Sequence, residues 1–484
     1  MASGFQQLES WIRDFRTRRL PDEAIDQAKF LLLDTLGCAL AALSEETVKR
    51  TLKVVAEVGE ADQSRILGTG MRSSPPNAVF ANGVLIRALD LNDYFGGNRV
   101  VGHPSDNIAV ALSIGDWQRR SGLDVLTAIV LGYELYGRLQ DRIDPKSPWD
   151  HTTASGIVAS AMAGFLMNLD GERMSHALAL SAVYCPTLGT IRRGYLSAAK
   201  GMANATVSQG AVFQTMLAAN GITGPLGALE GTDGLNAVVL SRSGISERFF
   251  AGEDHYRIMS AGIKPYPCVG TSQSLVAAAL EVRPRVAEKL DEIERVDVAM
   301  ADLPMVVTQV EDLARRHPTS REAADHSFYF LPAVALLDGE LTTVQFDDCR
   351  WEDPRANALM DRMTIRTDKN LNERAPNAFP VRIRVVMGDG QEHVAEVLYH
   401  PGHPLNRLDT EGVIGKFARY NGLKHHKIDW HALAKEVEAL DSSPNLDGIL
   451  RIVCPGRVQR HGSQKKKIQK KKTQNKRSQN RRRG

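Results

Sequence analysis

The first 265 residues carry the hydrophobic spacing of α-helices. Apolar or small residues recur at Ile25, Ala28 and Leu32, which places them on one face of a helix. This stretch opens at Pro21, which two acidic residues follow, and the composition suits the first turn of a helix. Further along, Ala and Gly crowd segments such as 151–169, and their small size lets helices approach closely. The pattern predicts a large helical region.

The pattern changes after about residue 265, where strand-like alternation begins. In residues 379–400, Val381, Ile383 and Val385 alternate with arginines, so one face of the strand is apolar and the other is charged. Gly-Asp-Gly at 388–390 supplies a turn, and the segment therefore predicts a β-hairpin.

A second strand and several helices are predicted around this hairpin. Residues 293–300 alternate in the manner of a strand, whereas 327–339 and 353–363 have helical spacing. Helical spacing then returns in 409–420 and 429–440.

These patterns predict a mainly α protein with two domains. We expect a large helical domain built from both ends of the chain, residues 1–264 and 403–454, with a smaller α+β domain inserted at 265–402. A length of 484 residues is too great for one compact core, which agrees with this division.

Charge is distributed unevenly along the chain. Residues 455–484 contain 13 of the 60 Lys and Arg residues and no acid, so the rest of the chain has 47 basic against 57 acidic residues and a net charge of −10. We predict that 455–484 is a disordered basic tail. Because it has no aromatic residues and the body is acidic, we do not predict nucleic acid as a partner.

The cysteines do not form a metal-binding or disulfide motif. There are five in 484 residues, and none is spaced as CxxC or CxxxC. A reducing compartment fits this usage, and we predict the cytoplasm. No stretch approaches ~18 uninterrupted apolar residues, and residues 1–15 lack a secretory core, so we predict no membrane segment.

Four short stretches combine titratable side chains with small residues, glycine or proline. The candidates are Asp90 and Asp93 with His103 in the first stretch, His151 in the second, Lys200 in the third and Lys264 in the fourth. A fifth stretch, residues 318–330, contains Asp325 and His326, which taken alone we interpret as a helix N-cap.

Taken together, these side chains indicate acid–base chemistry. Two histidines can act as acid and base near neutral pH. Two lysines can bind carboxylates and stabilise the negative charge of an enolate-like species. Since no metal or redox motif accompanies them, we predict proton abstraction next to a carboxylate without a cofactor. The residue types do not identify the substrate.

The chain also resembles the MmgE/PrpD family, which includes 2-methylcitrate dehydratases, cis-aconitate decarboxylases and iminodisuccinate epimerases. The similarity covers about residues 5–450 and rests on the order and spacing of short motifs. These are FLLLDTLGCALAAL (30–43), NGVLIRALDLNDY (82–94), GHPSDN (102–107), GITGP (221–225), GIKPYPC (262–268) and REAADHS (321–327).

The resemblance implies a large all-helical domain, an inserted α+β lid and an active site in the cleft between them. It also implies a homodimer that needs no metal or cofactor. By position, the catalytic residues would be Asp90, His103, His151, Lys200 and Lys264.

In this interpretation the flanking Gly102 and Pro104 hold His103 at the mouth of the cleft, because a preorganised loop keeps an acid–base group near the substrate proton.

Two positions depart from the pattern typical of the dehydratases. Those enzymes commonly read YPAEFHAQTA where this chain reads YPCVGTSQSL, so Thr271 replaces a histidine and Gln273 is kept. Tyr94 stands where a small hydroxyl residue often follows the LDxxD motif. With Asp93, these residues are expected to contact the substrate. Thr271 does not titrate near pH 7, so any role of the missing ring falls to His103, His151 or no residue.

The favoured function is a cofactor-independent lyase or dehydratase acting on a di- or tricarboxylic acid of the 2-methylcitrate type. A cis-aconitate decarboxylase, or an epimerase of imino- or amino-dicarboxylates, remains open on the same scaffold. Racemisation needs no acid for a leaving group and would therefore tolerate Thr271. A catalytically inactive scaffold, or a nucleic-acid partner bound through the tail, is disfavoured by the acidic body and the lysine–histidine set.

Overall fold

The computed structural model describes residues 3–96, 101–143, 147–192, 196–240, 244–245, 249–250, 255–375, 378–420 and 428–454. The predicted basic tail, 455–484, lies outside the described residues.

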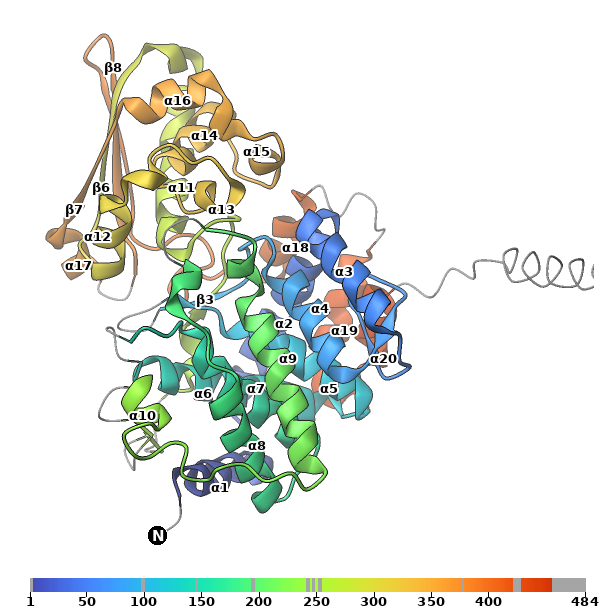
Figure 1. Ribbon diagram of the computed structural model, residues 1–484. Helices are drawn as coiled ribbons and strands as arrows, with labels where there is room; N and C mark the ends of the chain where they lie inside the picture. Colours follow the sequence, from blue (N-terminus) through green and yellow to red (C-terminus); the bar gives the residue numbers. More distant parts are fainter. Residues whose placement is uncertain are drawn as a thin grey trace, which may run out of the picture.

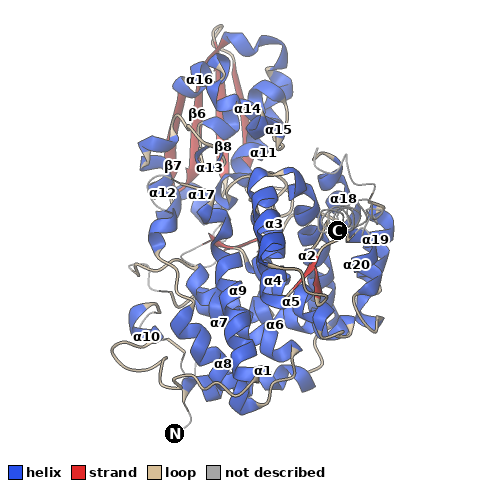
Figure 2. Cartoon of the chain, turned by 45° about the vertical axis from the view of Figure 1, so that its right-hand side comes forward, coloured by secondary structure: helices blue, strands red, loops and turns tan. Residues whose placement is uncertain are grey.

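Helices dominate the described chain, as Figures 1 and 2 show, so the prediction of a mainly α protein is confirmed. The helices outside the α+β region are α1 (Gly4–Thr17), α2 (Asp22–Ala41), α3 (Glu46–Val58), α4 (Pro75–Arg87), α5 (Ile108–Trp117), α6 (Gly122–Gln140), α7 (Thr152–Leu166), α8 (Gly171–Tyr184), α9 (Ala199–Ala219), α10 (Leu235–Val238), α18 (Thr410–Ala418), α19 (Trp430–Glu438) and α20 (Asp447–Val453).

The α+β region contains β6 (Ile293–Ala301), β7 (Met363–Asp368), β8 (Val381–Met387) and β9 (Glu392–Val397), with α11 (Gln273–Val282), α12 (Pro304–Glu311), α13 (Arg321–Ala324), α14 (Phe330–Asp338), α15 (Val344–Asp347), α16 (Pro354–Asp361) and α17 (Lys369–Arg374).

Two hydrophobic cores organise these elements. The first contains side chains from Phe5 to Ile263 and again from Val413 to Val453, and we call the elements around it the helical unit. The second contains side chains from Tyr266 to Ala395, and its elements form the α+β unit. Helices α18 and α19 pack against α2, and α20 packs against α19 (Figure 1), so both ends of the chain meet in one unit. The predicted domain boundaries, and the role of the α+β unit as a lid, stay predictions.

Small residues and helix-start signals position the helices of the helical unit. The first turn of α2 carries two acids, Asp22 and Glu23, as the sequence predicts. Helices α4 and α9 approach so closely that a Cβ atom at Gly83 would lie 2.9 Å from the Cβ of Ala205. This packing brings α9, which carries Lys200, against the end of α4 that leads to Asp90.

A buried ion pair joins the returning C-terminal segment to this region. Lys416 of α18 is fully buried, and its Nζ lies 2.6 Å from Oδ1 of Asp34 on α2. The same ammonium donates to the carbonyl of Leu91, 3.0 Å away, which directly follows Asp90. Helix α18 therefore supports the backbone that presents Asp90.

The four-stranded sheet of the α+β unit has the order β7-β6-β8-β9. Strands β6 and β7 are parallel, whereas β6 and β8, and β8 and β9, are antiparallel. Val381, Ile383 and Val385 are buried as predicted, because α11 packs on β8 and β9, and α14 packs in turn on α11 (Figure 1). The Gly388–Gly390 turn closes the hairpin, with Gly390 at φ +83°.

The expectation that the large domain is all-helical is wrong in detail. The helical unit contains two small antiparallel sheets, one of β1 (Ser64–Arg65) and β2 (Arg72–Ser73), the other in the order β4-β3-β5. In the second sheet, β3 is Tyr94–Gly96, β4 is Val101–Gly102 and β5 is Ala261–Gly262. Strands of two or three residues are too short to produce a two-residue period, so the sequence pattern does not reveal them.

One described helix, Asp22–Ser44, is long and apolar enough by length and composition to cross a membrane. Of its most apolar window, 83 % is buried inside the protein, as in a core helix.

Candidate active site

A cavity of about 350 Å³ is lined by residues of both units. Its charged and titratable wall residues are Arg87, Asp90, His103, His151, Arg192, Lys200, Arg315 and His326. Four of the five predicted catalytic residues are therefore in one wall, although they are up to 110 positions apart in the sequence. The fifth, Lys264, is fully buried behind Asp90.

Asp90 is the centre of the charged part of this wall. Its Oδ1 accepts from Nη1 of Arg87 at 2.6 Å and from the ammonium of Lys264, and its Oδ2 lies 3.4 Å from Nζ of Lys200. Burial opposes the charged form of Asp90, but the three cations outweigh it and hold its pKa well below the usual range. The residue also has a φ of +49°, an uncommon left-handed conformation for a residue other than glycine. Asp90 is therefore a fixed carboxylate at any pH near neutral.

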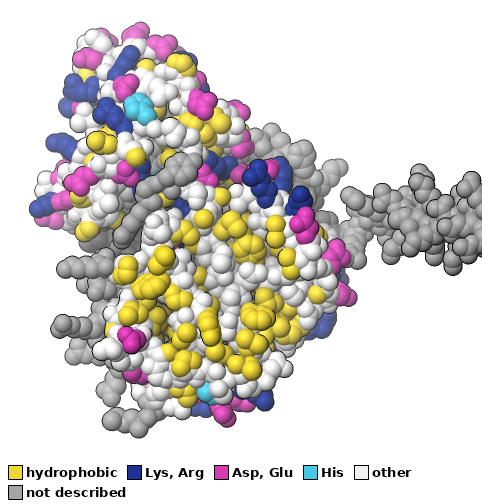
Figure 3. Space-filling view, viewed as in Figure 1, with side chains coloured by type: hydrophobic (Ala, Val, Ile, Leu, Met, Phe, Trp, Pro, Cys, Tyr) yellow, Lys and Arg dark blue, Asp and Glu magenta, His cyan; other side chains and the backbone are white. Residues whose placement is uncertain are grey.

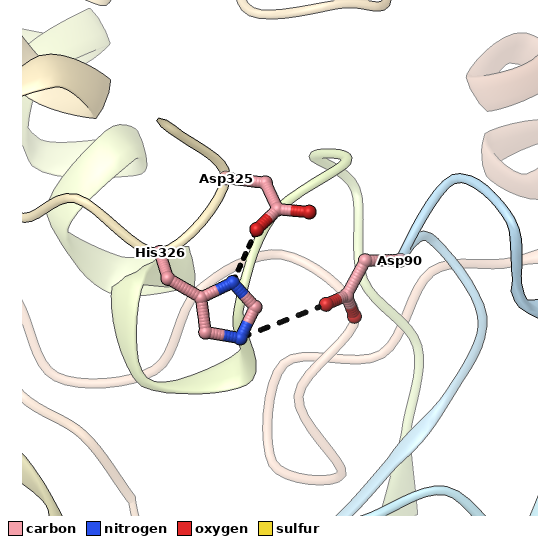
Figure 4. A group of neighbouring side chains, drawn as sticks. All are labelled: Asp90, Asp325 and His326. Carbon is pink, nitrogen blue, oxygen red and sulfur yellow. Dashed lines mark hydrogen bonds and ion pairs between the residues drawn. The ribbon is translucent and has the colours of Figure 1, made fainter. Parts of the chain in front are cut away.

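Asp325 and His326 of the α+β unit approach Asp90 across the cavity. Figure 4 shows the three side chains pointing toward one another, with a bond between His326 Nδ1 and Asp325 and an ion-pair contact of 3.9 Å between His326 Nε2 and Asp90. The ammonium of Lys200 lies 3.1 Å from the His326 ring nitrogens and 3.5 Å from Oδ1 of Asp325. Burial, with the charge of Lys200, lowers the pKa of His326 to about 4.

The same three residues would suit a metal ion by type, since their ligand atoms lie within 4.8 Å of one another. However, the Lys200 ammonium is within 3.5 Å of all three of them. A divalent cation at this place would be repelled by that ammonium. The residues therefore fit a network of ion pairs with lysine at its centre, and they do not fit a metal site.

His103 is held so that one ring nitrogen is a hydrogen-bond acceptor. Its Nδ1 lies 2.7 Å from the carbonyl oxygen of Asp93, and a carbonyl only accepts, so Nδ1 carries the proton. The lone pair is then on Nε2. Burial and the charges of Arg87 and Lys264 lower the pKa of His103 well below its usual value, so the ring is neutral at pH 7.

Gly102 and Pro104, the residues on either side of His103, are each required by a different feature of the structure. A Cβ atom at Gly102 would collide with the hydroxyl of Tyr136, and Pro104 opens a short 3-10 helix. His103 itself is only 7 % exposed, so it lies within the cavity wall. The expectation that it lies at an open mouth of the cleft is therefore wrong.

His151 begins α7 and is linked to His103 through Tyr136. The Tyr136 hydroxyl accepts from the backbone N–H of His103 at 3.3 Å and lies 3.2 Å from Nδ1 of His151. Its own proton can therefore go to that Nδ1, which leaves the proton of neutral His151 on Nε2. Burial lowers the pKa of His151 to about 4, against the opposing effect of Asp150. The two histidine ring centroids are 6.5 Å apart.

Of the predicted substrate-contacting residues, only Thr271 lines the cavity, where its hydroxyl donates to Oε1 of Gln309 at 3.2 Å. Asp93 is fully buried and accepts from the hydroxyls of Ser105 and Tyr133, and burial raises its pKa to about 7. Its carbonyl holds His103, so Asp93 lies behind the wall.

Tyr94 and Gln273 likewise lie away from the cavity. The Tyr94 hydroxyl lies 2.8 Å from Nε2 of His400. The Gln273 amide donates to the carbonyls of Tyr266 and Cys268, both at 3.0 Å, and so fixes the loop that carries Lys264. Tyr94 and Gln273 therefore stabilise neighbouring segments of the protein and do not line the cavity.

Several wall residues escaped the sequence interpretation. The N-cap assignment for Asp325 is wrong, because Ser320 caps α13 and Asp325 lies at its C-terminal end. His326 is a third histidine of the wall, beside His103 and His151, and it was not among the predicted site residues.

Three arginines, Arg87, Arg192 and Arg315, were not predicted either. Arginine is common on protein surfaces, and only the tertiary structure brings these three together.

Most of the chain matches models of one known protein family. Residues 6–248 match the MmgE/PrpD N-terminal domain, and residues 266–439 match the MmgE/PrpD C-terminal domain. The chain belongs to the MmgE/PrpD family. The predicted resemblance is thereby confirmed.

Similar members of the MmgE/PrpD family are named as dehydratases. The 2-methylcitrate dehydratase of Escherichia coli K12 is 27 % identical over 412 residues, covering 80 % of this chain and 83 % of that protein. That of Cupriavidus necator is 28 % identical, covering 80 % of this chain and 83 % of its own length. An alkylcitrate dehydratase of a fungal species is 28 % identical over 438 residues, covering 82 % of this chain and 84 % of that protein. The prediction of an MmgE/PrpD-type enzyme is confirmed.

Proposed function

We propose that the protein is a hydro-lyase that removes water from a tricarboxylic acid of the 2-methylcitrate type by acid–base catalysis. The observation that carries this proposal is the neutral ring of His103, which holds its proton on Nδ1 and lines a cavity whose wall also contains Arg87, Arg192, Lys200 and Arg315. The names of the relatives support the same reaction class.

In the proposed reaction His103 is the base. Its Nε2 takes the proton from the carbon next to a substrate carboxylate, and the electron pair of that C–H bond forms the C=C bond. Negative charge develops on the carboxylate during this step, and the ammonium of Lys200 stabilises it. Asp90, held by Arg87 and Lys264, fixes the position of Lys200.

His151 is the proposed acid for the departing hydroxyl. The C–O bond breaks as Nε2 of His151 supplies a proton, so the hydroxyl leaves as water. A bound polyanion places negative charge near both rings and raises their pKa values, which brings His151 toward the range where it can act as an acid. The ring centroids of His103 and His151 are 6.5 Å apart and both rings line the same cavity, so one bound substrate can contact both.

A second reaction is favoured by one observation. Thr271 lines the cavity where many dehydratases of the family have a histidine, and a hydroxyl of this kind does not titrate near pH 7. Epimerisation of an imino- or amino-dicarboxylate, or decarboxylation of cis-aconitate, would not require an acid at that position. His326 in the same wall favours dehydration, because it restores a third ring.

A panel of di- and tricarboxylates incubated with the protein in D2O distinguishes these reactions by proton NMR. Dehydration gives an olefinic product from 2-methylcitrate. Epimerisation replaces the α-proton by deuterium without loss of water or CO2, and decarboxylation of cis-aconitate releases CO2. We expect the first result, and turnover confined to either of the others would refute the dehydratase proposal.

Three further expectations enter the proposal without deciding it. The α+β unit is taken as a lid over the cavity, the protein as cytoplasmic, and its assembly as a homodimer. Hydrophobic side chains gather on the helical unit in Figure 3, and residues exposed on or next to α8 and α9 include Tyr184, Leu188 and Phe213. A face of this kind suits a subunit interface. The mass in solution, measured by light scattering, tests the dimer.

A further inference from the structure

Two arginines of the cavity wall have no part in the proton transfers described above. Arg192 ends the 3-10 helix Gly189–Arg192 of the helical unit, and Arg315 ends the 3-10 helix Leu313–Arg315 of the α+β unit. Their side chains are 24 % and 18 % exposed, so both reach the cavity while remaining largely enclosed.

The two guanidinium groups are held in the same way. Nε of Arg192 donates to Oδ2 of Asp150 at 2.7 Å, and Nε of Arg315 donates to Oδ2 of Asp312 at 2.8 Å. For both arginines, the described residues include no acceptor for the two terminal amino groups. A guanidinium held at Nε presents its remaining N–H groups as a planar fork, which matches the two oxygens of a carboxylate.

Both supports are themselves fixed. Asp150 accepts from the backbone N–H and the hydroxyl of Thr152, at 3.1 and 2.7 Å. Oδ1 of Asp312 accepts from the backbone N–H of Ala314 at 3.2 Å, and the backbone carbonyl of Arg315 accepts from the hydroxyl of Ser327. Each fork is therefore oriented before a ligand arrives, which lowers the entropy lost on binding.

We propose that Arg192 and Arg315 are specificity-determining residues, each of which binds one carboxylate of the substrate while Lys200 binds the third. This inference deepens the proposed function, because it names the tricarboxylate as the class that fills the site. A dicarboxylate leaves one of the three cations without a substrate carboxylate. The site should therefore discriminate by the number of carboxylates as well as by size.

Binding of two unreactive ligands tests the proposal by calorimetry. Tricarballylate has three carboxylates, and glutarate lacks the central one; neither has a hydroxyl group to lose. We expect the wild-type protein to bind tricarballylate more tightly. Arg315→Gln and Arg192→Gln should each weaken tricarballylate binding by about 10- to 100-fold, the effect of losing a charge-assisted contact. Glutarate should lose less, because it can use the two remaining cations, so the preference for tricarballylate should largely disappear.

Arg316→Gln is the matched control. Its guanidinium lies over the ring of Tyr329 at 5.3 Å, and Arg316 is not part of the cavity wall. Arg315→Lys, which keeps the charge but loses the planar fork, should give an intermediate loss. Circular dichroism checks that each variant is folded.

The proposal is overturned if the wild type binds neither ligand or binds both equally, if Arg192→Gln and Arg315→Gln keep the preference, or if Arg316→Gln loses as much affinity. Failure of the proposed function gives a different result. A protein with the expected binding pattern that does not dehydrate 2-methylcitrate would refute the reaction and leave the assignment of Arg192 and Arg315 intact.

Discussion

Substitutions of His103 test whether this residue is the catalytic base or only fixes its loop. His103→Ala removes the Nε2 acceptor and should lower kcat by about 10²- to 10⁴-fold, the usual contribution of a general acid or base. At 1.36 kcal/mol for each factor of ten, this corresponds to about 3 to 5 kcal/mol of transition-state stabilisation. KM should change less, because the proposed carboxylate contacts are made by Lys200, Arg192 and Arg315.

His103→Asn is the discriminating variant, because of the contact that the ring makes. The asparagine amide can still donate to the carbonyl of Asp93, which accepts from His103 Nδ1 at 2.7 Å in the wild type. If His103 only fixes its loop, this variant should recover most of the rate. If it is the base, the variant should be as slow as His103→Ala. Steady-state kinetics on folded samples measure the difference, and an asparagine variant within a few-fold of wild type would refute the assignment and leave His151 as the candidate.

The wild-type pH profile provides an independent check on the same residue. Burial and the neighbouring cations lower the pKa of His103 in the free protein, and a base must be neutral to accept a proton. Therefore kcat/KM should not decline as the pH falls from 8 to about 6.5, and a loss from protonation of the base should begin only at lower pH. A decline centred above pH 7 would contradict the geometry around Nδ1 and Nε2.

Two further predictions concern stability. Lys416→Met removes the ammonium that pairs with buried Asp34 and donates to the carbonyl of Leu91, so it should cost about 3 to 5 kcal/mol of unfolding free energy. The double variant Lys416→Met with Asp34→Leu should recover most of that loss. Urea unfolding measures both variants, and equal losses in the two would argue against a buried ion pair. Lowering the pH from 7 to 4.5 should lower the midpoint of thermal unfolding. His151 and His326 have pKa values of about 4 in the folded protein, so between pH 6.5 and 4 these two residues bind more protons in the unfolded chain than in the folded one. A midpoint that is unchanged or rises would contradict the buried, neutral state of the two rings.

The sequence predicts the regular elements where one face is clearly buried. The alternation of Val381, Ile383 and Val385 correctly predicts β8, since those side chains pack under α11 and the intervening arginines face away. Strand β7 was missed because, of its six residues, only Met363 is buried, which leaves no alternating pattern. Its parallel pairing with β6 depends on a neighbour about 70 positions away, and local periodicity contains no information about that pairing.

The site could be predicted only where residue type and loop context mark a side chain as unusual. His103 between glycine and proline, and Lys200 in a run of small residues, stand out in this way. Arg192 and Arg315 do not, because an isolated arginine is indistinguishable from a surface residue until the two units face one another. Lys416 has the same difficulty, since nothing in its amphipathic helix indicates that it is fully buried against Asp34.

The central claim is the elimination of water from a tricarboxylate with His103 as the base. Proton NMR of 2-methylcitrate in D2O, with wild-type protein and with His103→Ala at the same concentration, tests it most directly. We predict that the wild type converts the substrate to the olefinic tricarboxylate and that the variant does so at least 100-fold more slowly. Unchanged 2-methylcitrate with the wild-type protein, or equal rates in the two samples, would contradict the claim.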